Sequence, residues 1–211
     1  SLMTDIRKKG LTTREIATIA ILAAVASILF MVEIPIVLFY KLDFSNLPAL
    51  LAMFAMGPVA GTLTLFIKSL VGLLHSSSQG VGELADFLVG LAMILPAGMI
   101  YRRDKTRRGA LLGMALGGVC ATVVGVLSNV YLLIPFYGAV YGMPVEQIIG
   151  MGQALIPSIH TVWEFVLLIT APFNLLKWTV LSAAGWFLYK PLSPILHGRA
   201  RGAARAGGAK Q

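Results

Sequence analysis

The sequence predicts an all-α membrane protein, a bundle of six transmembrane helices with both termini in the cytoplasm. Of the 211 residues 57% are hydrophobic and only 12% are charged, with a mean hydropathy of +0.84. A soluble domain needs more charge to cover its surface. Several apolar runs reach the roughly 17–25 residues that a bilayer-spanning helix requires. Short basic stretches flank these runs, as cytoplasmic loops do under the positive-inside rule.

The basic residues indicate topology and lipid contact rather than nucleic-acid binding. Of 17 Lys and Arg residues, 14 fall in three clusters, Arg7–Arg14, Arg102–Arg108 and Lys190–Lys210. All three adjoin apolar segments, where basic groups attract anionic lipid head groups. We expect residues 1–12 to form a cytoplasmic segment, 13–190 the transmembrane domain, and 191–211 a basic, disordered cytoplasmic tail.

The first helix is expected from Thr13 to Val32. Thr12 or Thr13 can cap it, and Glu15 stands in its first turn. Pro35 follows the end of this helix, and an apolar, aromatic loop continues to Phe44 on the outer side.

The stretch Ser45–Leu74 is either one long helix or two helices broken at Gly57-Pro58, because proline removes a backbone donor and disfavours helix at the residue before it. Further helices are expected at Gly82–Tyr101, Gly109–Ile134 and Ser158–Tyr189, with outer loops at 75–80 and 136–157. A single crossing would put the Arg102–Arg108 cluster opposite the N-terminal cluster. Two crossings put all three clusters on one side, which favours six helices.

Two helices carry stripes of small residues, which allow close helix packing in lipid. On the fifth helix they recur every four positions, at Gly109, Gly113, Gly117, Ala121 and Gly125. The first helix has a similar stripe that includes Ala20 and Ala24. That alanine face could pack internally or meet a partner protein.

Ionisable groups inside apolar segments are costly and need an explanation. The candidates are Lys68, Glu83, Asp86, Glu164 and Lys177. Glu83 and Asp86 stand near the start of the fourth helix, where carboxylates favour the helix dipole. They serve either this structural role or a functional one, and Lys68 could pair with one of them.

Asn174 and Lys177 form the clearest candidate site. Three residues apart on the last helix, they project from one face and offer donors and an acceptor within an apolar span. Trp163, eleven residues before Asn174, would place an aromatic surface on the same stripe, and Asn129 adds a buried amide. These groups either bind a ligand or hold the helices together.

The sequence offers no catalytic constellation and no metal site. Its three histidines are scattered, and no His/Cys set has metal-ligand spacing. The single Cys120 excludes an intrachain disulfide. Because no Walker A pattern occurs, ATP used for active transport would be hydrolysed by another protein.

Several segments resemble the riboflavin-specific S components (RibU family) of energy-coupling factor (ECF) transporters. The resemblance covers about residues 12–192, through the segments Lys41–Leu50, Phe54–Pro58, Ile67–Leu70, Gly80–Phe87 and Asn174–Lys177. Its most specific part is Leu42-Asp43-Phe44-Ser45 with the downstream Asn174-Leu175-Leu176-Lys177, whereas the Gly57-Pro58 turn alone is not specific. Departures are Asn46, where an acidic residue is expected in many relatives, and Ser69, where Asn is expected.

This resemblance implies a six-helix protein of the prokaryotic cell membrane that captures riboflavin from the outside. It would dock on a transmembrane coupling protein (EcfT) carried by two cytoplasmic ATPases, with the Ala20/Ala24 face as the docking surface. The residues implied to contact riboflavin are Leu42, Asp43, Phe44, Asn129, Asn174 and Lys177, and with less support Lys68, Glu83 and Trp163. Riboflavin would be the transported ligand, with no catalytic cofactor.

Other hypotheses remain. Lys177 could meet the phosphate of FMN, so FMN is a second candidate ligand. An S component for another vitamin such as thiamine is the nearest alternative. An intramembrane enzyme with Glu83, Asp86 or Glu164 as general base would need a converging acid/base partner. A plain helical scaffold would tolerate Ala at Asn174 and Lys177.

Overall fold

The computed structural model describes residues 10–197. Its elements in chain order are α2 (Thr13–Phe30), β1 (Ile34–Val37), β2 (Tyr40–Leu42), α3 (Leu47–Met56), α4 (Pro58–Leu73), α5 (Val81–Arg103), α6 (Arg107–Ser128), the π-helical segment η1 (Asn129–Leu133), α7 (Ile134–Tyr141), α8 (Val145–Gln153), α9 (Val162–Phe165), the π-helical segment η2 (Val166–Thr170) and α10 (Ala171–His197). The predicted all-helical architecture is thus nearly correct, with one added feature, the antiparallel hairpin β1–β2.

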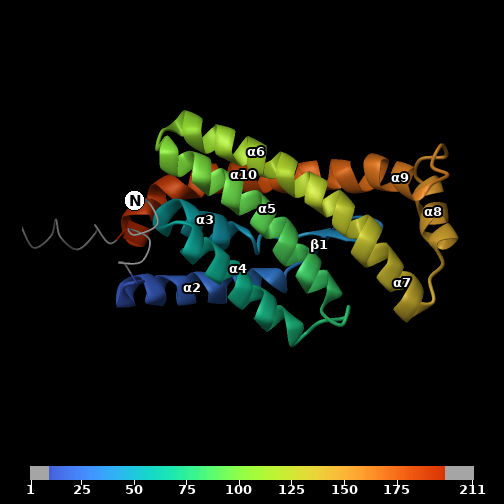
Figure 1. The fold of residues 1–211 in the computed structure, drawn as a ribbon, viewed down its shortest axis with the longest axis horizontal. Helices are drawn as coiled ribbons and strands as arrows, with labels where there is room; N and C mark the ends of the chain where they lie inside the picture. The colour runs from blue at the N-terminus through green and yellow to red at the C-terminus, as the bar shows by residue number, and fades with distance from the viewer. Residues whose placement is uncertain (1–9, 198–211) are drawn as a thin grey trace, which may run out of the picture.

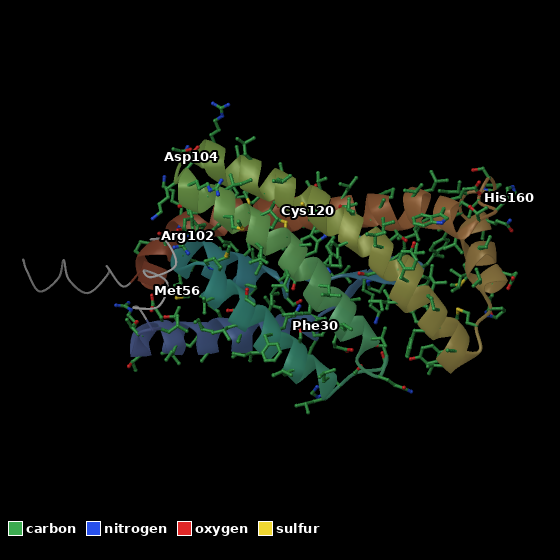
Figure 2. The ribbon with its side chains drawn as sticks, in the orientation of Figure 1. Phe30, Met56, Arg102, Asp104, Cys120 and His160 are labelled. Atoms are coloured by element: carbon green, nitrogen blue, oxygen red, sulfur yellow. The ribbon has the colours of Figure 1, made fainter. Side chains whose placement is uncertain are left out.

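The helices form an elongated bundle in which most of them run along the long axis (Figure 1). The start of α2, the α5–α6 turn and the end of α10 lie at one end, and α7, α8 and α9 lie at the other. Figure 2 shows Arg102 and Asp104 at the first end and His160 at the second.

Four helical stretches of the described chain are long and apolar enough to cross a membrane, Thr13–Phe30, Val81–Arg103, Arg107–Tyr141 and Val162–Ile195. Two shorter apolar helices, Leu47–Met56 and Pro58–Leu73, lie among them. The protein is a multi-pass membrane protein.

The break expected at Gly57-Pro58 is present. Gly57 ends α3 with φ of 102°, a conformation that an L side chain rarely adopts. A Cβ there would also lie 2.3 Å from Nη1 of Arg102. Pro58 then begins α4, where its missing N–H costs nothing. The predicted start of the first helix is also confirmed, since Thr12 and Glu15 form a reciprocal capping box.

The glycine stripe of α6 packs on α5, as its spacing predicts. A Cβ at Gly113 would lie 2.5 Å from the carbonyl oxygen of Ala97, and one at Gly117 would lie 2.3 Å from that of Met93. Because only glycine leaves room for this approach, the two backbones come into direct contact along the stripe.

Two expectations about the chain's second half need correction. Residues 136–157, expected as an outer loop, are largely helical, in α7 and α8. The last helix continues to His197, so the part of the expected tail at 191–197 is helical. The rest of that tail (198–211) and most of the expected cytoplasmic segment (1–9) lie outside the described residues.

Candidate functional site

A cavity of about 280 Å³ lies where the hairpin, the start of α5, the α6–η1 junction and α10 meet. Its polar lining includes four residues that the sequence analysis singled out as ligand contacts, Asp43, Asn129, Asn174 and Lys177. All four side chains are buried. Residues up to 134 positions apart in the chain therefore line one cavity.

Four charged side chains and one hydroxyl form a closed ring at this cavity, and three of them, Asp43, Asp86 and Lys177, line it. Lys68, fully buried, forms an ion pair with Asp86 and donates to Ser45 Oγ at 3.1 Å. Ser45 in turn donates from its hydroxyl to Oδ1 of Asp43. Lys177 completes the ring, with Nζ 3.8 Å from Asp43 Oδ2 and 3.6 Å from Asp86 Oδ1.

The ring holds two cations and two anions, so its charge is balanced. This balance is what permits four ionisable groups inside an apolar bundle, because an unpaired buried charge is strongly unfavourable. The predicted pairing of Lys68 is confirmed, with Asp86 as its partner.

Within the ring, the two lysines differ in their availability. Lys68 donates to Ser45 Oγ and to Asn46 Oδ1, the latter at 2.6 Å, besides its pairing with Asp86. Lys177 stands beyond normal hydrogen-bond distance from both carboxylates, and it lines the cavity. Its ammonium is therefore held in place by charge while its N–H donors face a ligand space.

Asn129 is fixed by the hairpin and by its own helix. Tyr40 donates from its hydroxyl to Asn129 Oδ1 at 2.8 Å, and Asn129 Nδ2 donates to the Gly125 carbonyl at 2.8 Å. Thr170 Oγ1 lies 2.5 Å from the Tyr40 hydroxyl. Burial raises the pKa of Tyr40, so its phenol keeps the proton that it donates. One Asn129 N–H remains for a ligand.

Asn174 is fixed in a similar way, with its acceptor left available. Its Nδ2 donates to the Thr170 carbonyl at 2.9 Å. Its amide packs against Gly125, where an added Cβ would lie 2.8 Å from Asn174 Oδ1. Gly125 thus belongs to the site as well as to the packing stripe.

Each of these amides follows or begins a π-helical segment. Asn129 begins η1, and η2 ends at Thr170, four residues before Asn174. In each segment the next residue bonds five positions back, Ile134 to Asn129 and Ala171 to Val166. A proline, Pro135 or Pro172, stands two residues after each segment and cannot donate to the carbonyl four positions earlier. Such π turns often occur at functional sites.

Aromatic rings form the apolar side of the cavity. Tyr40 stacks on Phe173 with centroids 5.0 Å apart, and Phe39 meets Tyr137 edge to face at 5.5 Å. These four rings line the cavity together with Phe30 from α2. The site therefore offers flat apolar surfaces on one side and fixed donors and acceptors on the other.

The remaining predicted contacts lie in different places. Glu83 lines the cavity and accepts from Ser76 Oγ at 2.7 Å. Leu42 is buried, Phe44 is half-buried, and Lys68 is a member of the charged ring. None of these three is among the described residues that line the cavity.

Trp163 is 46% exposed and is likewise absent from the described residues lining the cavity. The π-helical segment η2 lies between Trp163 and Asn174. One extra residue in a helical turn rotates the following face by about 100° relative to a regular helix. The stripe expected from a regular helical period therefore does not continue across η2.

Sequence reasoning missed three parts of the site. It named Asp86 as a helix-start carboxylate, a possible partner of Lys68 and a general-base candidate, but not among the ligand contacts, although Asp86 joins the two lysines. It also missed the cavity-facing Tyr40 and Phe173. The adjacency of Tyr40 to the Lys41–Ser45 segment was the available signal for Tyr40, and Pro172 beside Phe173 was a weaker one.

The alanine face of α2 is open to the outside of the bundle. Ala20 and Ala24 are exposed, whereas Ile19, Ala23 and Ala26 are buried against the neighbouring helices. The sequence left the role of this face undecided. In the described residues Ala20 and Ala24 are exposed, so the face is available to a partner protein.

The chain is similar to several known proteins. The family model described as the ECF transporter, substrate-specific component, matches residues 14–185. The riboflavin transporter RibU of Staphylococcus aureus (strain TCH60) is 30% identical over 186 residues, 87% of this chain and 92% of that protein. The riboflavin transporter FmnP of Bacillus subtilis (strain 168) is 24% identical over 187 residues, 86% of this chain and 93% of that protein.

A solved structure described as the S component of a bacterial ECF transporter has the same fold. It matches with a TM-score of 0.67 and 31% identity, over 86% of this chain and 96% of that one. The family match, its extent and the shared fold agree: the chain belongs to the family of substrate-specific (S) components of ECF transporters, a transporter family and not an enzyme family.

Proposed function

We propose that this protein binds riboflavin from the outside and delivers it for ATP-driven uptake together with an EcfT-type coupling protein and two cytoplasmic ATPases. The observation that carries the proposal is the cavity in which aromatic rings face a set of buried amides and an available lysine. Riboflavin presents an apolar tricyclic ring, a uracil-like edge and a hydroxylated chain, which need this combination.

Each polar group has a distinct role in the proposal. Lys177 and Asn174, on adjacent turns of α10, would donate to and accept from the uracil-like edge or the ribityl hydroxyls. Asn129 has one free N–H for the same purpose. Asp43, held by Ser45, would accept from a ligand hydroxyl. Tyr40 and Phe173 would pack on the ring system.

The names of the relatives support riboflavin over another vitamin, because RibU and FmnP are both described as riboflavin transporters. Two further predictions stay open to test within this proposal. FMN would be a second ligand if the Lys177 ammonium donates to its phosphate. Leu42, Phe44, Lys68, Glu83 and Trp163 would contribute to binding directly or through neighbouring residues.

The proposed topology has six membrane crossings, both termini in the cytoplasm and the cavity near the outer side of a prokaryotic cytoplasmic membrane. The start of α2, the basic α5–α6 turn and the end of α10 at one end of the bundle support it. Single-cysteine variants in a Cys120→Ser background would test it. A cysteine at Ser77 should react with an impermeant thiol reagent in intact cells, and one at Thr106 should not.

The binding experiment uses protein purified in detergent. A bound flavin should give visible absorption bands that persist through gel filtration, and added riboflavin should lose fluorescence on binding. Lys177→Met should weaken riboflavin binding about 10- to 150-fold, the effect of losing a charged hydrogen bond of ~1.5–3 kcal/mol. Arg108→Met, which removes an exposed cation at the other end of the bundle, is the matched control.

The proposal fails if the purified protein is colourless and does not quench riboflavin fluorescence. If an excess of thiamine displaces riboflavin and restores its fluorescence, the result would instead support thiamine as the vitamin. Equal affinity of the Lys177→Met and Arg108→Met variants would remove Lys177 from the site while leaving riboflavin as the ligand.

A further inference from the structure

A second cavity, of about 560 Å³, lies at the opposite end of the bundle from the proposed vitamin site. It opens between the α5–α6 turn and the last turns of α10, near Arg102 and Asp104 in Figure 2. Its rim carries three cations, Lys105, Arg107 and Lys190, and none of its lining residues is acidic. All three side chains are exposed.

These cations have no carboxylate partner in the described part of the chain. Ion pairs among the described residues, such as Lys41 with Glu33 and the two ring lysines with Asp43 and Asp86, do not involve these three cations. Three positive groups around one empty space create a local field that attracts an anion. The α6 N-terminus at Arg107, capped by Thr106, adds to that field.

The walls of this cavity are aromatic. Tyr101, Trp186 and Tyr189 line it together with the buried residues Phe54 and Met114, and the ring centroids of Tyr101 and Tyr189 lie 4.9 Å and 5.7 Å from that of Phe54. Tyr and Trp in this arrangement are typical of the membrane–water interface, where one side of the ring is wet and the other apolar. The cavity therefore sits at head-group depth in the proposed topology.

An apolar groove continues from the cavity along the lipid-facing side of the bundle. It runs between α6 and α10 and shares Met114, Trp186 and Phe187 with the basic cavity. Its α6 side extends from Leu111 to Val119, about 12 Å at the rise of an α-helix. That length fits within the ~15 Å that half of a bilayer core offers to an acyl chain.

We propose that the basic cavity and the adjoining α6–α10 groove bind an anionic phospholipid of the cytoplasmic leaflet. The phosphate would lie among Lys105, Arg107 and Lys190, and one acyl chain would lie along the groove. Charge alone would suit any phosphate, and the groove alone would suit any apolar chain. Only a lipid joins both chemistries in one molecule, so the continuity of the two features selects it. The site lies outside the vitamin cavity; it rests on the proposed membrane topology and does not depend on which vitamin is bound.

The test is native mass spectrometry of the full-length protein in detergent, titrated with dioleoylphosphatidylglycerol or with dioleoylphosphatidylcholine. The two lipids have the same chains and differ in net head-group charge. The anionic lipid should bind more tightly. The double variant Arg107→Gln/Lys190→Gln should weaken its binding about 30-fold, from ~1 kcal/mol for each interfacial cation.

Two matched controls separate the cavity and the groove from general effects. Arg103→Gln/Arg108→Gln removes two exposed cations of the same cluster that do not line the cavity, and it should leave the affinity within a few-fold. Ala115→Trp fills the groove and should weaken binding of the anionic lipid. Leu116→Trp alters the neighbouring exposed position outside the groove and should not.

Three results would overturn the proposal. Equal binding of the two lipids would remove the role of charge. Equal losses in the two double variants would reduce the effect to overall surface charge. Displacement of the lipid by glycerol 3-phosphate at a similar concentration would show a site for soluble phosphates without a role for the groove. Unchanged gel-filtration profiles and unfolding temperatures of the variants confirm that each remains folded.

Discussion

The ion pair between Lys68 and Asp86 gives the most direct test of how this bundle tolerates buried charge. Lys68 is fully buried, and its ammonium contacts one carboxylate and two neutral acceptors, Asn46 Oδ1 at 2.6 Å and Ser45 Oγ at 3.1 Å. Asp86→Leu would leave those two acceptors and remove the carboxylate. The lysine would then be a buried charge without its counter-ion.

The expected cost follows from that geometry. Breaking a buried pair by removing one partner costs ~3–5 kcal/mol, whereas an exposed pair is worth ~0–1 kcal/mol. Asp86→Leu and Lys68→Met should each lower the free energy of unfolding by several kcal/mol. The double variant Lys68→Met/Asp86→Leu should recover most of this loss, because it removes both charges of the pair. The remaining cation, Lys177, still has a carboxylate, Asp43, 3.8 Å from its Nζ.

The assay is reversible unfolding in mixed micelles, with the free energy of unfolding determined for the parent protein, both single variants and the double variant. The coupling energy of this cycle isolates the pair from each residue's separate packing. A single-variant loss below about 1 kcal/mol would place the pair among weak surface pairs and refute the reasoning. So would a double variant whose loss equals the sum of the two single losses.

Three other substitutions test the site and the docking face. Gly125→Ala should displace the Asn174 amide and weaken riboflavin binding in the fluorescence titration at least tenfold. The control Gly118→Ala, whose Cβ would meet only Trp178 Cβ at 3.7 Å, should leave binding unchanged, and equal effects of the two variants would contradict the assigned contact. Tyr40→Phe leaves the Asn129 acceptor buried and unpaired, so the free energy of unfolding should fall by ~1–3 kcal/mol. An unchanged free energy of unfolding would show that this hydrogen bond contributes no net stability. Ala24→Leu should abolish co-purification with the EcfT-type partner and leave riboflavin affinity unchanged, because bulk at a small-residue face prevents close helix approach; retained assembly would exclude this face.

The sequence predicted those features of the fold that depend on local chemistry. Pro58 after Gly57 specified the break between α3 and α4, because neither residue continues a helix without a penalty. The capping box at the start of α2 was equally local. Asn174 and Lys177 line one cavity because three residues are nearly one helical turn.

Features that depend on distant contacts or on an altered helical period were not predictable in this way. The partner of Lys68 could have been Glu83 or Asp86, which lie three residues apart, and only the packing of α4 against α5 selects Asp86. Trp163 was placed by a regular period that η2 interrupts. Proline positions hint at both π segments, but proline in a helix can also produce a kink or a helix end.

The charged ring places the proposed vitamin site in contact with the proposed docking helix. Phe30, near the C-terminal end of α2, lines the cavity, and its ring centroid lies 4.7 Å from Nζ of Lys68. The same helix exposes Ala20 and Ala24 two to three turns earlier, on the face proposed to meet the coupling protein. A shift of α2 along its axis would therefore change the surroundings of Lys68. The charged ring connects Lys68 through Asp86 to Lys177. Because the ring balances its own charges, it can hold Lys177 toward the cavity whether or not the neutral vitamin is bound. The arrangement thus provides a continuous set of contacts from the docking face to the ligand donors.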